Sequence, residues 1–377
     1  MVIGILKEPA GENRVSLLPE NVKQLIQLKT VVLAEKNAGF RAFADDKGYE
    51  AVGATMVSKI DIFAKADLIL SIHSLAESDF ALIKKGTVWL GDYDPLYHLP
   101  LLKQFASFGW TVFSLDNIPR TTRAQSMDIR SSQANIAGYK AVLLAAYAYS
   151  RYFPMFMTAA GSIAPAKMLV VGAGVAGLQA VATGRRLGAV VEVFDTRPAV
   201  KEEVMSLGGK FIEVEGATDV SKAGGYAVEQ SEEYKQKQQQ KIAESVAKAD
   251  IIISTAQIPG RKAPVLITKS MIEKMRSGSV IVDLAAASGG NTELTKDNDT
   301  IQYNGIIIIG NSNLPSEMAS DASKLYGKNV LNFLKLIIDK DGNLNLNFQD
   351  ELVSGTCITY DGKITNERVR KFFNLSD

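Results

Sequence analysis

A glycine-spaced turn between an apolar run and a helical stretch constrains the fold of this chain more than any other feature. Residues 168–171 (Met-Leu-Val-Val) are typical of a buried strand, residues 176–187 have a helical pattern, and between them comes Gly172-Ala173-Gly174-Val175-Ala176-Gly177. This order of strand, turn and helix predicts a dinucleotide-binding domain. In such a turn Gly172 permits the tight bend, Gly174 lets the backbone approach a pyrophosphate, and Gly177 allows the helix to pack closely on the strand. The helix N-terminus would offer its free N–H groups to the anion.

The residue at the end of the next expected strand, 190–194, indicates which dinucleotide binds. Asp195 stands there, and a carboxylate at this position accepts hydrogen bonds from the adenosine ribose and repels a 2′-phosphate. We therefore expect NAD(H) as the cofactor rather than NADP(H), although Arg197, two residues on, could favour a phosphate. The alternative is a glycine-rich turn in an α/β domain that binds no nucleotide.

Short strands alternate with helical stretches along the whole chain. Its length of 377 residues suggests two or three domains, and the alternation predicts an α/β fold with parallel sheets. We expect two Rossmann-like domains, the second a dinucleotide-binding domain. The first comprises residues 1–130 together with 320–377, and the NAD(H)-binding domain comprises residues 140–315. The expected strands are 2–6, 30–33, 66–70, 87–90 and 111–113 in the first domain, and 168–171, 190–194, 251–253, 280–282 and 306–309 in the second.

The composition excludes several classes of site. Lys and Arg number 42 against 41 Asp and Glu, so the net charge of +1 creates no field that would attract nucleic acid. One cysteine, Cys357, cannot form an intrachain disulfide, and with only two histidines, His73 and His98, we expect no metal site. The most apolar stretch, residues 141–161, is interrupted by Arg151 and Pro154. We expect a buried helix ending near Tyr152 rather than a membrane span, and the N-terminus does not resemble a signal peptide.

Three further segments have two readings each. Residues 120–128 with Ser131 and Gln133 are rich in hydrogen-bonding groups, which suits either the polar lining of a nicotinamide pocket or a surface loop that caps a helix starting near Asp128. Residues 283–291 follow a buried strand, where open α/β sheets place ligands, or they form a plain turn. Residues 216–241 form either a functional lid or an exposed loop, and the polar run 229–241 predicts a solvated helix.

Several of these segments together resemble one family. RTTRAQSMDIRSSQANIAGY (120–139), GAGVAGLQA (172–180) and GGYA (224–227) resemble the NAD(H)-binding component, domain I, of proton-translocating NAD(P) transhydrogenases. KAPVLIT (262–268), VDLAAASGGN (282–291), NLPSEMASDAS (313–323) and VSGTC (353–357) extend the likeness over nearly the whole chain. The family is related to alanine dehydrogenases, which share the fold and the opening pattern from Gly4 to Arg14.

The resemblance implies a role for individual residues. Those that match the nicotinamide-side, catalytic positions are Arg120, Gln125, Asp128 and Ser131, and Gln125 would bond the nicotinamide ribose. Those that match the cofactor-binding positions are Gly172, Gly174, Val175, Ala176 and Gly177 at the pyrophosphate, Asp195, Thr196 and Arg197 on the adenosine side, Gly225 and Tyr226 in a closing loop, and Gln238 and Gln257 beside the nucleotide.

The chemistry separates the two related activities. Oxidation of an amino acid moves a proton as well as a hydride and needs an acid–base group. The resemblance implies a Lys, a His and an Asp for this in alanine dehydrogenases. This chain has Ser-Ile-His-Ser-Leu (71–75) around the expected Lys and Ala286 and Ala287 near the expected Asp, although Arg14 is kept. Hydride transfer between two nicotinamides needs only proximity, orientation and exclusion of water. An NAD sensor without catalysis would not explain residues 120–128.

One fingerprint predicts one nucleotide site in this chain. The resemblance implies that NADP(H) lies on a partner subunit, that further subunits span the membrane, and that hydride transfer is coupled to proton translocation. It also implies a homodimer that is cytoplasmic and is held on the inner face of the membrane through its partner subunits.

Overall fold

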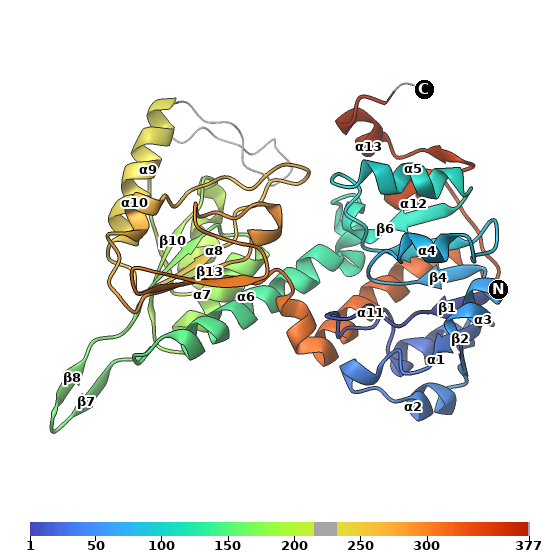
Figure 1. The fold of residues 1–377 in the computed structure, drawn as a ribbon, viewed down its shortest axis with the longest axis horizontal. Helices are drawn as coiled ribbons and strands as arrows, with labels where there is room; N and C mark the ends of the chain where they lie inside the picture. The colour runs from blue at the N-terminus through green and yellow to red at the C-terminus, as the bar shows by residue number, and fades with distance from the viewer. Residues whose placement is uncertain (215–231, 376–377) are drawn as a thin grey trace. The chain divides into compact units, whose positions relative to one another are not determined.

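The chain divides into two compact units (Figure 1). The computed structural model describes residues 1–214 and 232–375. The first unit comprises Met1–Gln133 and Pro315–Asp377, and the second comprises Ala134–Leu314. The helix α6 (Ile129–Ala148) begins in the first unit and continues into the second.

The first unit is built on an eight-stranded sheet with the order β17-β16-β6-β5-β4-β1-β2-β3. Its strands are β1 (Val2–Ile5), β2 (Val31–Glu35), β3 (Thr55–Val57), β4 (Leu68–Leu70), β5 (Val88–Gly91), β6 (Thr111–Ser114), β16 (Cys357–Tyr360) and β17 (Lys363–Ile364). Strands β1 to β6 are parallel, and β16 and β17 add antiparallel pairs at one edge. The strand order reverses between β1 and β4, which makes this pair the topological switch point of the first sheet.

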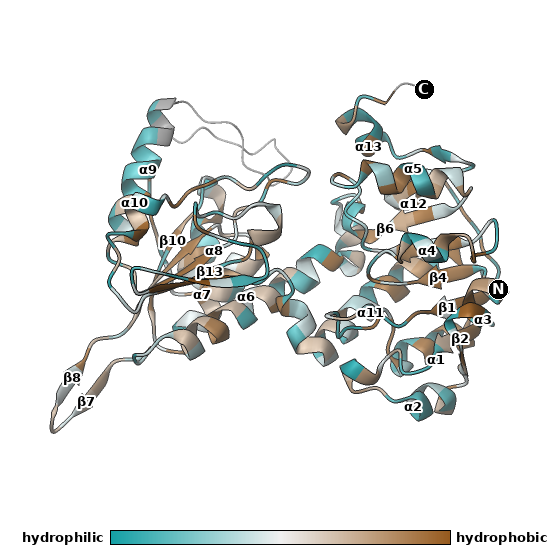
Figure 2. Cartoon of the chain, in the orientation of Figure 1, coloured by the Kyte–Doolittle hydropathy of each residue, from teal (hydrophilic) through white to brown (hydrophobic). Residues whose placement is uncertain are grey.

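Helices connect the parallel strands because a parallel pair cannot be joined by a tight turn. The helices of the first unit are α1 (Pro19–Gln27), α2 (Asp46–Ala51), α3 (Lys59–Lys65), α4 (Glu77–Phe80), α5 (Leu99–Ser107), α11 (Ala319–Ile337), α12 (Glu351–Thr356) and α13 (Glu367–Phe372). Apolar residues fill both faces of the sheet, one face packing Leu68 and Phe113 and the other Ile69 and Trp89. Figure 2 shows these central strands as mostly hydrophobic.

The second unit repeats this arrangement in a seven-stranded sheet with the order β11-β10-β9-β12-β13-β15-β14. Its strands are β9 (Lys167–Val171), β10 (Val190–Phe194), β11 (Lys210–Phe211), β12 (Ile251–Ser254), β13 (Val280–Asp283), β14 (Asp299–Tyr303) and β15 (Ile306–Gly310), and its helices are α7 (Val175–Arg186), α8 (Lys201–Ser206), α9 (Glu232–Val246) and α10 (Lys269–Ile272). All pairs are parallel except β14 with β15. The order reverses between β9 and β12, so this pair is the second switch point.

The two parallel sheets confirm the predicted α/β class with two Rossmann-like domains. The edge strands β3, β11 and β14 and the antiparallel pair β16 and β17 were not expected, since β14 is mainly polar and the others are short. Helix α9 is mostly exposed, as the polar run 229–241 predicts. Of the possible lid at residues 216–241, the part 216–231 lies outside the described residues.

Residues 141–161 do not form the expected buried helix that ends near Tyr152. Helix α6 ends at Ala148, and the strands β7 (Phe156–Thr158) and β8 (Gly161–Ile163) form an exposed antiparallel hairpin that extends away from the sheet of the second unit (Figure 1). Pro154 would in any case prevent a helix from continuing past Phe153. Among the described residues, no helix combines the length and the apolarity that crossing a bilayer requires.

Candidate functional site

The glycine turn of the second unit lies at its switch point, between the end of β9 and the start of α7. Gly172 has φ +100°, a conformation that favours glycine, and its N–H bonds the carbonyl of Phe194 at 2.8 Å. A Cβ on Gly177 would lie 1.9 Å from the Gly172 carbonyl oxygen, whereas a Cβ on Gly174 would meet nothing within 4 Å. Packing inside the chain therefore requires a glycine at 177, whereas nothing in the chain itself crowds position 174.

This turn fits a pyrophosphate. Gly174 is the N-cap of α7, and as a glycine it has no side chain that could cap the first N–H groups of the helix. A helix of this length directs its N-terminal dipole and its free N–H groups at an anion. The exposed Val175 and the half-buried Ala176 continue the turn into the helix.

The carboxylate of Asp195 connects the glycine turn to the end of β10. It accepts hydrogen bonds from the Ala173 N–H at 2.7 Å and the Arg197 N–H at 2.8 Å. The Arg197 guanidinium donates to both of its oxygens, each at 2.9 Å, and these hydrogen bonds raise the pKa of Arg197. Arg197 is thus paired with the acid rather than presented as a separate phosphate ligand. Thr196, between them, is half-buried.

Two further strand ends complete this edge of the sheet. Thr255, which follows β12, donates from Oγ1 to the Gly172 carbonyl at 3.0 Å. After β13, the buried Asn291 side chain accepts from the Ala256 N–H at 2.9 Å and donates to the carbonyls of Ala256 and Pro264 at 2.8 and 2.9 Å. The loop 285–292 is therefore held against the end of β12 by hydrogen bonds. Residues 283–291 thus do more than form a plain turn, because they connect two strand ends.

Asp283, fully buried at the end of β13, holds that loop from beneath. One carboxylate oxygen accepts from the Ala285 N–H, and the other accepts from the N–H groups of Asn291 and Thr292 and from the Thr295 hydroxyl. Sequence reasoning missed Thr255 and Ala256. The signal for both is a polar pair directly after a buried strand at the switch point.

The remaining expected cofactor residues lie as follows. Gln257 is exposed, and its amide donates to the Leu284 carbonyl at 2.9 Å. Gln238 is buried on α9. Gly225 and Tyr226 lie outside the described residues, so their expected contact with the nucleotide stays a prediction.

The polar segment 120–131 belongs to the first unit. A 3₁₀ turn, η3 (Thr122–Met127), buries Ala124 and Met127 in the core and exposes Gln125 between them. Within the described part of the chain, no hydrogen bond holds the Gln125 side-chain amide. Arg120 is also exposed. The Gln125 amide is thus available for a ligand on a turn anchored from both sides.

Asp128 and Ser131 form the N-terminal cap of α6. The Asp128 carboxylate accepts from the Ser131 N–H at 3.0 Å and from the Ser131 hydroxyl at 2.6 Å. The reading of this segment as a helix cap is therefore confirmed for these two residues. A cap does not exclude a role toward a ligand, because each carboxylate oxygen has a second lone pair.

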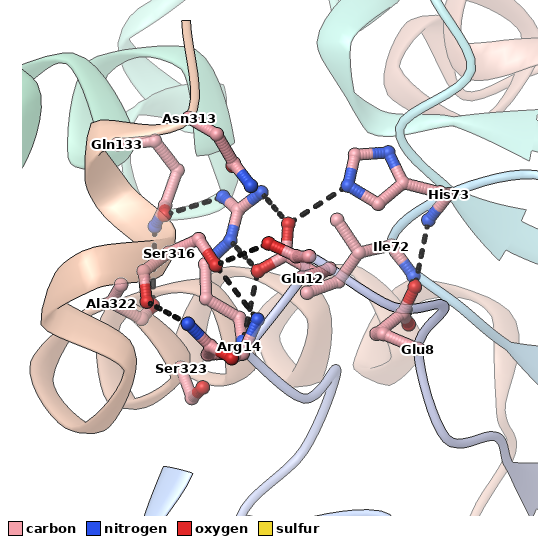
Figure 3. A network of polar contacts seen from close by, with 12 residues as sticks. Glu8, Glu12, Arg14, Ile72, His73, Gln133, Asn313, Ser316, Ala322 and Ser323 are labelled. Carbon is pink, nitrogen blue, oxygen red and sulfur yellow. Dashed lines mark hydrogen bonds and ion pairs between the residues drawn. The ribbon is translucent and has the colours of Figure 1, made fainter. Parts of the chain in front are cut away.

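A buried polar network occupies the switch point of the first unit (Figure 3). Glu12 accepts from the Arg14 guanidinium at 2.9 and 2.6 Å, and Arg14 donates to Gln133 at 2.9 Å. His73 Nε2 lies 2.8 Å from the same Glu12 carboxylate. Glu8 accepts from the backbone N–H groups of Ile72 and His73. Arg14, which the sequence keeps in common with alanine dehydrogenases, is therefore bound by an internal carboxylate.

Burial and charge set the protonation of this network. Burial raises the pKa of Glu8 to about 7 against the opposing hydrogen bonds of Ile72 and His73. Burial also acts to raise the pKa of Glu12, but the hydrogen bonds of Arg14 and His73 outweigh it and lower that pKa well below its usual range. Burial acts to lower the pKa of His73, and the hydrogen bond to Glu12 with the charges of Glu8 and Glu12 raises it overall. Glu12 is thus an ionised carboxylate that pairs with the Arg14 guanidinium and hydrogen-bonds the His73 ring.

Three carboxylates lie beside this network after β5 and β6. Asp92, Asp94 and Asp116 each bring an oxygen within 4.8 Å of the others. The Arg130 guanidinium lies 2.8 Å from Asp94 and 3.0 Å from Asp116 and supplies the positive charge that such a cluster needs.

Comparison with known proteins matches the whole chain to one family. The model "Alanine dehydrogenase/PNT, N-terminal domain" matches residues 4–137, and "Alanine dehydrogenase/PNT, C-terminal domain" matches residues 141–367. A relative from Rhodospirillum rubrum, named as the first part of NAD(P) transhydrogenase subunit alpha, is 46% identical over 97% of this chain and 98% of its own length. A crystal structure of transhydrogenase from Sinorhizobium meliloti matches with a TM-score of 0.88 and 43% identity, covering 97% of this chain and all of that one.

Alanine dehydrogenases are more distant. The enzyme of Mycolicibacterium smegmatis is 25% identical over the full length of this chain and 97% of its own. Both family models, the full-length identity and the shared two-unit fold therefore agree that the chain belongs to the alanine dehydrogenase/PNT family, on its transhydrogenase alpha-subunit side.

Proposed function

We propose that this chain is the NAD(H)-binding component of a proton-translocating transhydrogenase. In this function a hydride passes directly between NAD(H) on this chain and NADP(H) on a partner subunit, coupled to proton translocation. The observation that carries the proposal is the 46% identity to a transhydrogenase alpha subunit over nearly the full length of both chains. The open, uncapped glycine turn at the switch point of the second unit supports it independently.

The residues of this chain bind and orient the cofactor. The N-terminus of α7 and the open face of Gly174 hold the pyrophosphate, and Asp195 accepts from the adenosine ribose after Arg197 releases part of its pairing. Gln257 and Gln238 contact the nucleotide. Gly225 and Tyr226 match nucleotide-contacting positions of the family, and their contact with NAD(H) stays a prediction. The bound nicotinamide supplies the hydride carrier, a chemistry that no side chain of the chain provides.

Arg120, Gln125, Asp128 and Ser131 form the nicotinamide side of the site. Gln125 is the sharpest candidate, because its amide is exposed and unbonded on a turn whose neighbours are buried. An amide that bonds the nicotinamide ribose fixes the ring and leaves its reacting face open. Orientation of this kind accelerates a hydride transfer that needs no proton donor.

Oxidation of an amino acid is disfavoured by the network around Arg14. A substrate carboxylate would need a free guanidinium, and Arg14 donates to Glu12 twice and to Gln133 once. His73, near the position of the expected Lys, is likewise paired with Glu12. Ala286 and Ala287 offer no carboxylate on the loop after β13.

The partners follow from the proposed activity. NADP(H) binds a second subunit, and membrane-spanning subunits carry the proton. The chain is then cytoplasmic and peripheral on the inner face of the membrane, and it works as a homodimer. The exposed apolar side chains of Met155, Phe156 and Met157 on the β7–β8 hairpin support a surface that a second copy covers.

The test uses the purified chain and then the reconstituted complex. We expect NADH to bind more tightly than NADPH and no alanine-dependent reduction of NAD. In the complex, Gln125→Asn should slow hydride transfer by about 10-fold or more, because the shorter side chain misplaces the ring, while NADH affinity changes less than about 3-fold. Robust oxidation of alanine would refute the proposal, and equal losses of rate and affinity would refute a positioning role for Gln125.

A further inference from the structure

One backbone carbonyl in the nicotinamide-side segment accepts two hydrogen bonds from a single helix. The Ser126 carbonyl accepts from Asn329 Nδ2 at 2.8 Å and from Asn332 Nδ2 at 3.0 Å. The two asparagines lie one turn apart on α11, on the face that packs against η3. Two side-chain amides of one helix therefore converge on a single carbonyl of an exposed turn.

Asn329 also reaches beyond this turn. Its Oδ1 accepts from the Ser132 hydroxyl at 2.7 Å in the first turn of α6. The Asn329 amide therefore connects Ser126, which precedes the Asp128 cap, with Ser132 in the helix that follows it. Asn329 is only 8% exposed and its amide is bonded through both Nδ2 and Oδ1, which holds the side chain in one orientation.

Asn329 acts on the residue that precedes Ser126. The side-chain amide of Gln125 makes no hydrogen bond within the described residues. The position of its side chain therefore depends on the backbone of the turn. Ala124 and Met127 fix the turn by apolar burial, which is non-directional. The hydrogen bonds to the Ser126 carbonyl are directional, and they fix the orientation of the peptide group that follows Ser126.

We propose that Asn329, assisted by Asn332, is a positioning residue for hydride transfer that acts through Gln125. The inference rests on the proposed function of Gln125. Asn329 touches neither nucleotide. It fixes the backbone from which Gln125 reaches the nicotinamide ribose, and its removal leaves Gln125 present but misaligned.

The experiment is a double-mutant cycle in the reconstituted complex. Asn329→Ala, Gln125→Ala and the pair are compared for the rate of hydride transfer at saturating nucleotide and for the dissociation constant of NADH. We expect Asn329→Ala to slow transfer by about 10-fold while the NADH dissociation constant changes less than about 3-fold. In the Gln125→Ala background, Asn329→Ala should slow transfer by less than about 2-fold, because the residue it positions is gone.

Two further variants keep the test decisive. Asn332→Ala removes only the less buried donor and should slow transfer by a smaller factor, and it carries the test if Asn329→Ala does not fold. Lys328→Ala, exposed on the same helix, is the matched control and should transfer at the wild-type rate. Thermal unfolding of each variant shows whether a lost rate follows lost structure.

The outcomes separate the inference from the function on which it rests. A wild-type rate for both Asn329→Ala and Asn332→Ala overturns the inference alone. Full multiplication of the two single losses in the Asn329→Ala/Gln125→Ala pair also overturns it, since the residues then act independently. A wild-type rate for Gln125→Ala refutes the proposed role of Gln125 and the inference with it.

Discussion

Gly174 and Gly177 stand three residues apart in one turn, and their surroundings give them opposite tasks. A Cβ at Gly177 would meet a backbone oxygen of the same turn at 1.9 Å, and a backbone oxygen cannot move aside as a flexible side chain would. A Cβ at Gly174 would project into open space. Gly177 therefore serves the fold, and Gly174 leaves room for a ligand.

Alanine substitution at each position tests this difference. Gly177→Ala should destabilise the chain by about 1–3 kcal/mol, the usual cost of overpacking. Gly174→Ala should have an unfolding free energy within about 1 kcal/mol of the wild type. It should bind NADH at least about 10-fold more weakly, because its methyl group would occupy the proposed pyrophosphate position. Urea unfolding and NADH titration measure the two effects. Unchanged NADH affinity in folded Gly174→Ala would contradict a pyrophosphate site there.

Asp92 is a carboxylate whose burial is not offset by a hydrogen bond from any described residue. Burial raises the pKa of Asp92 to about 8, the neighbouring Asp116 and Asp94 act in the same direction, and Arg130 and Arg14 oppose them. Between the ordinary pKa near 4 and this value the folded chain holds a proton that the unfolded chain has released. The contribution of Asp92 to stability therefore falls as the pH rises through this range.

Asp92→Asn should remove that pH dependence, because the amide does not ionise. As the pH rises from 5 to 8.5, the unfolding free energy of the wild type should fall relative to that of the variant by about 1–3 kcal/mol. Urea midpoints at several pH values measure this change. Asp341→Asn is the control, since Asp341 is exposed in a surface ion pair. A difference from wild type that stays constant with pH would show that Asp92 does not hold the proton.

At the scale of elements, the loop after β13 is rigid because buried polar groups on both sides of it are bonded. Asp283 accepts from Asn291, and Asn291 bonds the backbone that follows β12. The ends of two neighbouring strands are thereby connected through side chains rather than through the sheet. Such bracing places loop residues at the sheet edge with little conformational freedom.

Asn291→Ala should remove the hydrogen bonds that hold the loop after β13 to the segment after β12. It leaves backbone groups of Ala256 and Pro264 without their partner, so we expect a loss of about 1–3 kcal/mol in stability together with weaker NADH binding. Gln257→Ala is the matched comparison, because Gln257 is exposed and makes one hydrogen bond to the loop. It should weaken NADH binding with little loss of stability. Thermal unfolding and NADH titration of both variants show whether Asn291 supports the loop while Gln257 acts only on NADH binding.

At the scale of the whole molecule, the hairpin β7–β8 exposes apolar side chains that have no covering surface within the described residues. Met155 is 63% and Met157 77% exposed, and Phe156 packs on Tyr152 with a centroid distance of 4.4 Å. A two-stranded hairpin is marginal in water without a partner surface. A second copy of the chain would provide that surface.

In the proposed homodimer, Met157→Asp should therefore shift the chain toward monomer, because a charge would be buried at the contact between copies. Light scattering after gel filtration measures the mass across a dilution series. Phe43→Asp is the control, since Phe43 is 89% exposed on the first unit, far along the chain from the hairpin. A wild-type mass for Met157→Asp at every concentration would exclude the hairpin as the dimer contact.

Local pattern predicts much of this architecture. Apolar runs such as 168–171 and 251–253 predict strands because a parallel sheet buries both faces of each strand. The spacing of Gly172, Gly174 and Gly177 predicts the turn because the positive φ of Gly172 and the crowding at Gly177 arise from neighbours within a few residues. The hairpin at 156–163 was missed, since exposed apolar residues cannot be distinguished from buried ones by type alone.

The sequence by itself determined the α/β class, the position of the glycine turn and the family resemblance, because those depend on neighbours in the chain. Only the tertiary structure decided what Arg14, Asp195 and Asn329 contact. Glu12 and Gln133 neutralise and hold Arg14, Arg197 pairs with Asp195, and Asn329 reaches Ser126 from a helix about 200 residues away in the chain. Hydrogen bonds between distant segments depend on how sheets and helices pack, and no local pattern encodes that packing.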